Sequence, residues 1–340
     1  LIQFRSYEYL YDLKSFLFQF DSIVKENDII MSNGQRLKDS WTKYNTDDVN
    51  MENMLNAWNE FDDPVGLCLD HSKFDGHYQE ELLEIEHAFW NCLFNNKYLA
   101  ELLEKQMNNQ GWTSNGIKFR VRGKRASGEY TTSGGNTLLN WHMIAEFLNY
   151  CGVLKYFIFV NGDDSVIIIN RSDLEKLGDL SSGVKFMINF NMKCEVEMVA
   201  EKFNNIVYCQ RSPCKLQGVW RWIKNPWRTL ARFSVCASKY LKCADRYLAG
   251  KSLCELFMSR GVPILQAMCL RGLHDSVDSK PLGSVDKVPA QNFANNATLG
   301  ISQITLEDRM NFEDTFGVTI QQQEEIEKAM TGDLPKNPIW

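Results

Sequence analysis

Apolar side chains recur along this chain of 340 residues in two patterns. A spacing of three or four residues, typical of an amphipathic helix, runs from Tyr9 to Phe20 and again from Met51 to Trp58. Short apolar runs, typical of buried strands, cover residues 65–69, 156–160 and 166–169. The pattern therefore predicts several helices combined with a small group of buried strands.

Two of the apolar runs are joined by a polar segment that contains Asn161, Gly162, Asp163 and Asp164. Asn-Gly between runs rich in β-branched and aromatic residues predicts a tight hairpin. Such a hairpin would hold Asp163 and Asp164 at a rigid tip. Adjacent carboxylates repel each other, which favours a divalent cation as their partner. The alternative is a surface hairpin in which both residues only favour the turn.

Two further carboxylates follow the apolar run 65–69. We expect Asp70 at the end of a strand and Asp75 near the start of a helix, where the helix dipole tolerates an anion. In the alternative interpretation, Asp75 is an ordinary helix residue and Asp70 lies in a solvated loop. Together with the hairpin, three carboxylates at strand ends can hold two Mg²⁺ ions, as two-metal phosphoryl transfer requires.

Five cations crowd into residues 118–125, where four of them alternate with Phe119, Val121 and Gly123 and Arg125 follows. A period of two predicts a strand with one basic face that is suited to phosphate contact. The alternative is a charged edge strand that discourages aggregation. The cations are Lys118, Arg120, Arg122, Lys124 and Arg125.

The next segment, residues 127–136, is rich in small and hydroxyl-bearing side chains and leads into a helix predicted to begin near Thr137. Small residues let the backbone approach a ligand closely, and hydroxyl and amide groups can recognise a sugar hydroxyl. The alternative is a helix cap with one extra turn.

The C-terminal third is predicted to be helical and basic in part. Residues 226–251 carry six cations against the single acid Asp245, with apolar residues at helical intervals. We interpret them as a basic amphipathic helix pair, with a solvated helix face or a calmodulin-type target as alternatives. Residues 275–300 predict a long loop, and residues 321–330 a final helix.

The composition is that of an ordinary soluble globular protein, with 44% hydrophobic and 24% charged residues. No apolar run approaches the roughly 18 residues of a transmembrane span. The ten cysteines lack the paired spacing of zinc sites, so reduced thiols in a cytosolic compartment are favoured. The net charge of −6 argues against non-specific nucleic-acid binding by the whole surface, but not against a basic channel.

Three of these segments, taken in order, resemble motifs A, B and C of the RNA-dependent RNA polymerases of positive-strand RNA viruses. The matching patterns are Asp70-x4-Asp75, Ser127-Gly-x3-Thr132-x3-Asn136 and Gly162-Asp163-Asp164. Flanking phrases beginning at Phe61, Tyr208 and Phe312 resemble tombusvirus-like and flavivirus-like enzymes. Two positions depart from the tombusvirus pattern, because Glu129 stands where Asp is usual and Thr131 where Asn is usual.

The resemblance implies an α+β polymerase right hand of palm, fingers and thumb, with an antiparallel palm sheet flanked by helices. Residues 1–62 would be a partial fingers segment. Residues 63–205 would form the palm with motifs A to D, including a fingers insertion near 94–124. Residues 206–340 would form the motif E hairpin and the thumb.

The resemblance also implies roles for single residues. Two Mg²⁺ ions, with Mn²⁺ as a substitute, would be held by Asp70 and Asp163 with support from Asp164. The ribose of the incoming nucleotide would be recognised by Asp75, Ser127, Thr132 and Asn136. Lys193 matches the motif D lysine that protonates the leaving pyrophosphate.

Contacts with RNA are implied for a third set of residues. The segment at Tyr208 matches motif E, which grips the primer end through Cys209 and Gln210. Template and product would be contacted by Lys118, Arg120, Arg122, Lys124, Arg125, Arg228 and Arg232. The start of the chain resembles the tail of the basic motif F, cut from a longer protein, with Arg5 remaining to bind the nucleotide.

The implied activity is template-directed RNA synthesis that replicates a viral RNA genome. The implied partners are template and nascent RNA, ribonucleoside triphosphates and other viral replication proteins. The implied location is the host cytoplasm, in a membrane-associated replication complex reached through segments or partners outside this chain.

Three other functions compete with this interpretation. A reverse transcriptase shares the palm, but typically places a bulky aromatic residue where Asp75 and Asn136 offer polar groups to a 2′-hydroxyl. A non-catalytic RNA-binding protein has no need for clustered carboxylates near phosphate. A metal-dependent nuclease explains neither the hydroxyl-rich loop nor the basic helices.

Overall fold

The computed structural model describes residues 5–113, 115–277, 279–282 and 301–332. The chain divides into two compact units, Leu1–Cys209 and Gln210–Trp340, which we call the N-terminal and C-terminal units. Among the described residues, no helix is both long enough and apolar enough to cross a membrane.

The N-terminal unit is built on a four-stranded antiparallel sheet with the order β4-β5-β1-β6. Its strands are β1 (Pro64–His71), β4 (Phe157–Asn161), β5 (Asp164–Asn170) and β6 (Cys194–Ala200). Residues 65–69 of β1 are all buried, as the continuous apolar run predicts, because β1 lies between β5 and β6 with helices packed around the sheet. The predicted strands and the antiparallel sheet are confirmed.

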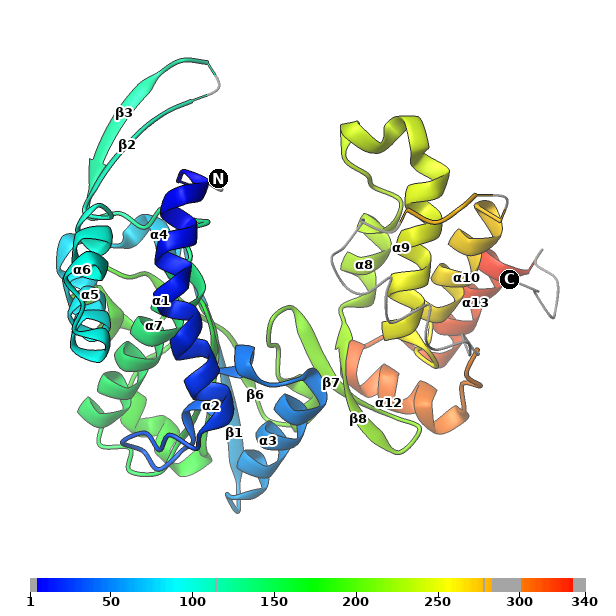
Figure 1. Cartoon of the computed structure of the whole chain (residues 1–340). Helices are drawn as coiled ribbons and strands as arrows, with labels where there is room; N and C mark the ends of the chain where they lie inside the picture. The colour runs from blue at the N-terminus through cyan, green and yellow to red at the C-terminus, as the bar shows by residue number, and fades with distance from the viewer. Residues whose placement is uncertain (1–4, 114, 278, 283–300, 333–340) are drawn as a thin grey trace. The chain divides into compact units, whose positions relative to one another are not determined.

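Helices surround this sheet (Figure 1). The α-helices are α1 (Tyr7–Glu26), α2 (Leu37–Ser40), α3 (Asp47–Asn59), α4 (Phe74–His77), α5 (Glu80–Phe94), α6 (Lys97–Glu104) and α7 (Thr131–Tyr150). Four short 3₁₀ segments complete the described unit, namely η1 (Thr42–Tyr44), η2 (Arg171–Leu177), η3 (Lys185–Phe190) and η4 (Phe203–Asn205). The two helices predicted from Tyr9–Phe20 and Met51–Trp58 are confirmed as α1 and α3.

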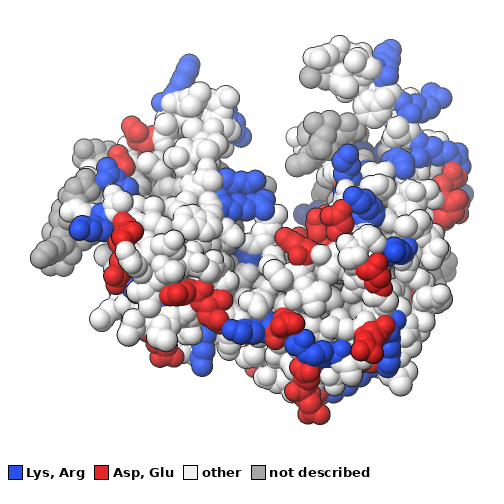
Figure 2. Space-filling view, turned by 180° about the vertical axis from the view of Figure 1, so that it is seen from behind, with Lys and Arg blue, Asp and Glu red and all other residues white. Residues whose placement is uncertain are grey.

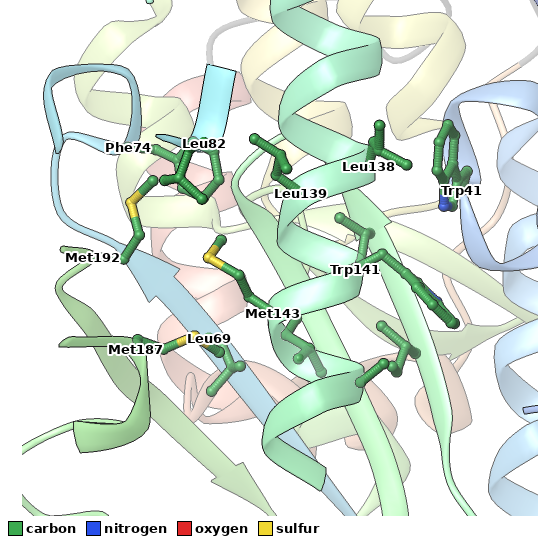
Figure 3. Close-up of a cluster of buried hydrophobic side chains, with 14 of the residues drawn as sticks. Trp41, Leu69, Phe74, Leu82, Leu138, Leu139, Trp141, Met143, Met187 and Met192 are labelled. Atoms are coloured by element: carbon green, nitrogen blue, oxygen red, sulfur yellow. The ribbon is translucent and has the colours of Figure 1, made fainter. Parts of the chain in front are cut away.

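The long helix α7 packs against β4, and side chains around most of its circumference are buried. Figure 3 shows its side chains Leu138, Leu139, Trp141 and Met143 within an apolar cluster. The cluster is completed by residues from other elements, among them Trp41, Leu69, Phe74, Leu82, Met187 and Met192. This burial stabilises α7 as a rigid support beneath the polar residues described below.

Helix α7 begins at Thr131, so the prediction that the helix starts near Thr137 is wrong. Ser133, Gly134 and Gly135 are poor helix formers and therefore suggested a loop. Close packing explains why glycine stands at position 135 of this helix: a Cβ atom there would lie only 2.5 Å from Glu86 Oε2. The glycine lets helix α5 approach the backbone of α7.

A separate two-stranded hairpin, β2 (Asn108–Trp112) with β3 (Lys118–Arg122), projects from the N-terminal unit (Figure 1). The strand predicted from the alternation of cations is therefore confirmed as β3. The hairpin pairs only with itself and is not part of the four-stranded sheet.

The C-terminal unit begins with an antiparallel hairpin, β7 (Arg211–Leu216) and β8 (Val219–Lys224). Its described helices are α8 (Pro226–Phe233), η5 (Ser238–Cys243), α9 (Ala244–Ser259), α10 (Leu265–Asp275), α12 (Leu306–Phe316) and α13 (Ile320–Thr331). The predicted basic helix pair corresponds to α8 and α9 with a 3₁₀ segment between them, and the predicted final helix is confirmed as α13. Most of the predicted loop 275–300 lies outside the described residues.

Candidate active site

The β4–β5 hairpin closes with Gly162 and Asp163 as its two central residues, because Asn161 pairs with Asp164 in the ladder. The predicted hairpin is confirmed, but the Asn-Gly turn is wrong by one residue, since Asn161 belongs to β4. Gly162 has φ +69°, the sign that a type II′ turn requires at its first central residue. This register places Asp163 in the turn itself and Asp164 at the start of β5.

Side chains of α7 hold this turn in place. The Gly162 amide donates to Thr137 Oγ1 at 2.9 Å. Asn140 Nδ2 donates to the carbonyl oxygens of Gly162 and Asp163, each at 3.1 Å. The turn is therefore bonded to a buried helix as well as to its own strands.

His71 completes the support for the turn. Burial lowers the pKa of His71 to about 4, so its imidazole is neutral near pH 7. His71 Nε2 lies 3.0 Å from Asn140 Oδ1 and donates to it, which fixes the direction of the Asn140 amide. Sequence reasoning missed Thr137, Asn140 and His71, because α7 carries several other polar residues and the spacing of Thr137 and Asn140 does not set them apart.

The carboxylates at the strand ends repel one another. Leu69 of β1 pairs with Ser165 of β5, which brings Asp70 beside Asp164. Desolvation, followed by the charges of Asp163, Asp70 and Glu197, raises the pKa of Asp164 to about 6. Desolvation also raises the pKa of Asp163, with smaller contributions from Asp75 and Asp70.

The chemistry of this acidic group fits a divalent cation, because carboxylate oxygens are the ligands that Mg²⁺ prefers and excess negative charge favours an ion. The described side chains are nevertheless not arranged as the metal centre expected from the sequence would require. Within the described ranges, no three His, Cys, Asp or Glu side chains are grouped closely enough to hold an ion. The strand register brings the carboxylate-bearing residues together, and the side chains are not gathered around a point.

Asp75 of α4 is the centre of a hydrogen-bonded trio. Ser127 Oγ donates to Asp75 Oδ2, and Asn136 Nδ2 donates to Asp75 Oδ1 at 2.7 Å. Three of the four residues expected to recognise a ribose are thus in contact. Thr132 differs, because its hydroxyl accepts from the Gly128 amide at 3.3 Å and closes the loop without bonding to Asp75.

The trio and the turn line a single cavity of about 1060 Å³. Its walls include Asp75, Ser127, Thr132, Asn136, Gly162 and Asp163. Two charged residues that sequence reasoning missed, Asp21 and Lys43, also line it, with Lys43 Nζ 3.2 Å from Asp21 Oδ1. The cavity therefore offers a hydroxyl- and amide-rich wall close to a carboxylate held on a rigid turn.

Comparison with known proteins shows the family to which the chain belongs. Residues 38–332 match the family described as "Viral RNA dependent RNA polymerase". The chain belongs to this family of viral RNA-dependent RNA polymerases.

The similarity extends to individual viral enzymes. The RNA-directed RNA polymerase of Cymbidium ringspot virus is 30% identical over 281 residues, which cover 80% of this chain and 34% of the relative. The enzyme of Tomato bushy stunt virus (strain Cherry) is 28% identical over 281 residues, with the same coverage of both chains. That of Melon necrotic spot virus is 30% identical over 295 residues, covering 83% of this chain and 36% of the relative. The chain thus spans about a third of the length of the curated relatives it matches.

In this viral polymerase chain, the basic strand does not present all five of its cations to solvent. Lys118 and Arg120 are exposed on β3, and Figure 2 shows Lys and Arg gathered along the β2–β3 hairpin. Arg122 instead pairs with Glu80, and Lys124 Nζ donates to the Tyr78 carbonyl oxygen at 2.6 Å. These two cations already have protein partners.

The structure corrects the expectation for Arg125. It was expected to contact RNA, but its side chain is completely buried and pairs with Glu86, whose side chain is also buried. A second carboxylate, Glu129, lies 3.7 Å from Arg125 Nη1. Alternation along a strand would place Arg125 on the face opposite to the other four cations, and β3 ends at Arg122, so the local pattern gave no basis for an exposed Arg125.

Arg5 is also placed differently from the expectation that it binds nucleotide. Its guanidinium pairs with Glu129 and donates to Asn109 Oδ1. Glu129, which stands where the tombusvirus pattern usually has Asp, is thus the partner of Arg5.

Lys193 lies immediately before β6, where its carbonyl oxygen accepts from the Ser72 amide at 3.0 Å. Its ammonium group is 2.7 Å from Glu195 Oε1, and both side chains are largely exposed. The backbone of Lys193 is therefore next to the segment that follows Asp70, and its catalytic role stays a prediction.

The motif E segment begins at the junction of the two units. Cys209 and Gln210 have φ values of +47° and +61°, which are unusual for non-glycine residues. Asn161 Nδ2 lies 3.7 Å from Cys209 Sγ, so this segment contacts the end of β4. Arg228 and Arg232 are exposed on α8, and RNA contact by these four residues stays a prediction.

Proposed function

We propose that this chain performs template-directed RNA synthesis, joining ribonucleoside triphosphates along an RNA template to replicate a viral genome. One observation carries the proposal: the trio Asp75, Ser127 and Asn136 lines the same cavity as Asp163. Sugar recognition and phosphoryl transfer have to occur side by side in such an enzyme.

The trio suits a ribose more than a deoxyribose. Each Asp75 oxygen accepts one hydrogen bond from the protein and retains a further lone pair. A 2′-hydroxyl can donate to that lone pair, which a deoxynucleotide cannot do. This favours ribonucleotides as substrates over those of a reverse transcriptase.

We further propose that Asp70 and Asp163, supported by Asp164, hold two Mg²⁺ ions, with Mn²⁺ as a substitute. When bound, such ions lower the pKa of the attacking 3′-hydroxyl and neutralise the charge of the triphosphate. The contribution of the chain is to position groups. Thr137 and Asn140 hold the turn that carries Asp163, so the carboxylate does not have to be ordered during the reaction.

The remaining assignments are proposals drawn from family membership and exposure. Lys193 would protonate the leaving pyrophosphate, and Cys209 and Gln210 would position the primer end. Exposed cations would contact template and product RNA, namely Lys118, Arg120, Arg228 and Arg232. The segments 1–62, 63–205 and 206–340 would serve as fingers, palm and thumb.

We also propose where such an enzyme acts and with what. It would work in the host cytoplasm with other viral replication proteins, in a complex attached to membranes through segments or partners outside this chain.

The substitution Asp163→Asn tests the proposed activity. It removes one charge and preserves shape, so nucleotide incorporation on an RNA template should fall at least about 1000-fold while the thermal unfolding midpoint is retained. The matched control is Asp48→Asn on the exposed side of α3, which should retain full activity. Near-normal incorporation by Asp163→Asn would contradict the assignment.

A further inference from the structure

A line of buried hydrogen bonds leads from the cavity wall into the protein interior. Tyr78 Oη donates to Asn136 Oδ1 at 2.9 Å, and Asn136 Nδ2 donates to Asp75 Oδ1 at 2.7 Å. Behind them, Arg125 Nη2 donates to Tyr78 Oη at 3.0 Å. Tyr78 is completely buried and is not among the residues that line the cavity, so its hydroxyl reaches the cavity wall through its partners, among them Asn136.

Arg125 at one end and the Asp75 carboxylate at the other together fix the direction of every proton in this line. A guanidinium can only donate, so the Tyr78 oxygen accepts from Arg125 and its own proton points to Asn136. Asn136 must then turn its carbonyl oxygen to Tyr78 and its amino group to Asp75. The flipped amide would set its oxygen against the Asp75 carboxylate and its amino group against the Tyr78 proton.

Buried ion pairs hold Arg125 itself. Its guanidinium pairs with Glu86, and its Nη1 donates to Thr131 Oγ1 at 2.7 Å. The adjacent Lys124 donates to the Tyr78 carbonyl at 2.6 Å, so the same loop contacts Tyr78 at both its backbone and its hydroxyl. Breaking a buried charged pair is strongly unfavourable, which makes this support stiff.

We propose that Tyr78 and Arg125 are positioning residues for sugar selection, which hold the Asn136 amide so that its second N–H faces a ribose 2′-hydroxyl. That hydroxyl would accept from Asn136 and donate to Asp75. A deoxyribose leaves the second Asn136 N–H and one Asp75 lone pair unpaired, and a site built around such bonds rejects the analogue that lacks the hydroxyl. This inference rests on the proposed function, because it assigns the two residues to nucleotide choice in that cavity.

The substitution Tyr78→Phe tests the proposal by removing only the hydroxyl. In an active polymerase containing this chain, we expect the ratio of kcat/KM for an NTP to that for the matching dNTP to fall about tenfold, through loss of NTP use. The matched control is Tyr156→Phe, since Tyr156 is also buried and its hydroxyl donates to Asn149 Oδ1 at 3.3 Å. The control should leave the ratio unchanged.

A double substitution separates positioning from simple packing. With Asn136→Ala already in place, Tyr78→Phe should cause no further fall in the ratio, because the amide that Tyr78 orients is gone. If the variants still incorporate NTP, an unchanged ratio for Tyr78→Phe alone would overturn the positioning role. An equal fall in the ratio with and without Asn136→Ala would overturn it as well. An unsubstituted enzyme that incorporates no nucleotide would instead overturn the proposed function and this role with it.

Discussion

Asn140 holds Asp163 through the backbone: its side-chain amide donates to the Asp163 carbonyl oxygen at 3.1 Å. The same amide reaches the Gly162 carbonyl, and His71 fixes the amide from the other side. Helix α7 therefore holds the backbone of Asp163 in addition to the hairpin that carries it. A buried helix is a stiffer support than a two-residue turn.

Replacing Asn140 with alanine should misplace the turn. We expect nucleotide incorporation to fall about 10- to 100-fold, because small displacements of a catalytic group are costly. The free energy of unfolding should fall by about 1–3 kcal/mol, because His71 and two carbonyl groups lose their partner. Asn149→Ala, at the exposed end of the same helix, is the control and should retain activity. Full activity in Asn140→Ala would show that the hairpin alone positions Asp163.

Two adjacent glycines of α7 should respond differently to alanine. Gly135→Ala places a Cβ atom 2.5 Å from Glu86 Oε2, which belongs to a buried group held by Arg125. The free energy of unfolding should therefore fall by about 1–3 kcal/mol. Gly134→Ala meets nothing closer than Lys43 Nζ at 3.5 Å and should be neutral or stabilising by up to about 1 kcal/mol. Denaturant unfolding of both variants measures the difference, and equal stabilities would contradict the close α5–α7 packing.

Removing charge at Asp164 should stabilise the protein when no metal is present. The pKa of Asp164 is raised to about 6 in the folded protein, so its charged carboxylate lowers the free energy of unfolding above pH 6. This loss of stability disappears as the pH falls through 6 towards 4. Asp164→Asn should therefore raise the free energy of unfolding by about 1 kcal/mol at pH 8 in EDTA, after allowance for solvent screening.

Added Mg²⁺ provides the complementary measurement for Asp164. The ion should raise the unfolding midpoint of the unsubstituted protein more than that of Asp164→Asn, because an ion stabilises the folded state that binds it. Lower stability of Asp164→Asn at pH 8 in EDTA would contradict the repulsion inferred here.

His87 should make the protein less stable in acid. Burial lowers the pKa of His87 to about 4, and its Nε2 lies 3.2 Å from Gln106 Oε1. His87 binds a proton near pH 6.5 in the unfolded chain but not in the folded chain. The stability contributed by neutral His87 is therefore fully present above pH 6.5 and is lost as the pH falls from 6.5 to 4. It amounts to roughly 2–3 kcal/mol.

Comparing unfolding of the unsubstituted protein and His87→Gln across that range isolates the effect of His87. Glutamine can still donate to Gln106, so the variant should lose less stability on acidification. Identical pH dependence of the two proteins would contradict a neutral, buried His87.

Local sequence was sufficient for the strands β1, β3, β4 and β5, for helices such as α1 and α3, and for the order of the carboxylates. Buried runs of β-branched residues and helical spacing act over neighbouring positions, so they can be read without knowing the fold. The same local reasoning misplaced the start of α7, because serine and glycine are poor helix formers and the close approach of Glu86 to Gly135 comes from a distant helix.

The sequence by itself determined which chemical groups this polymerase chain carries and in what order: Asp70, Asp75, Ser127, Asn136 and Asp163. Only the tertiary structure decided which of them are in contact and what supports them. Arg125 shows the reason most clearly, because a cation in a basic run became the buried partner of Glu86. Burial and pairing depend on residues far away in the chain, and a local pattern of charges contains no information about them.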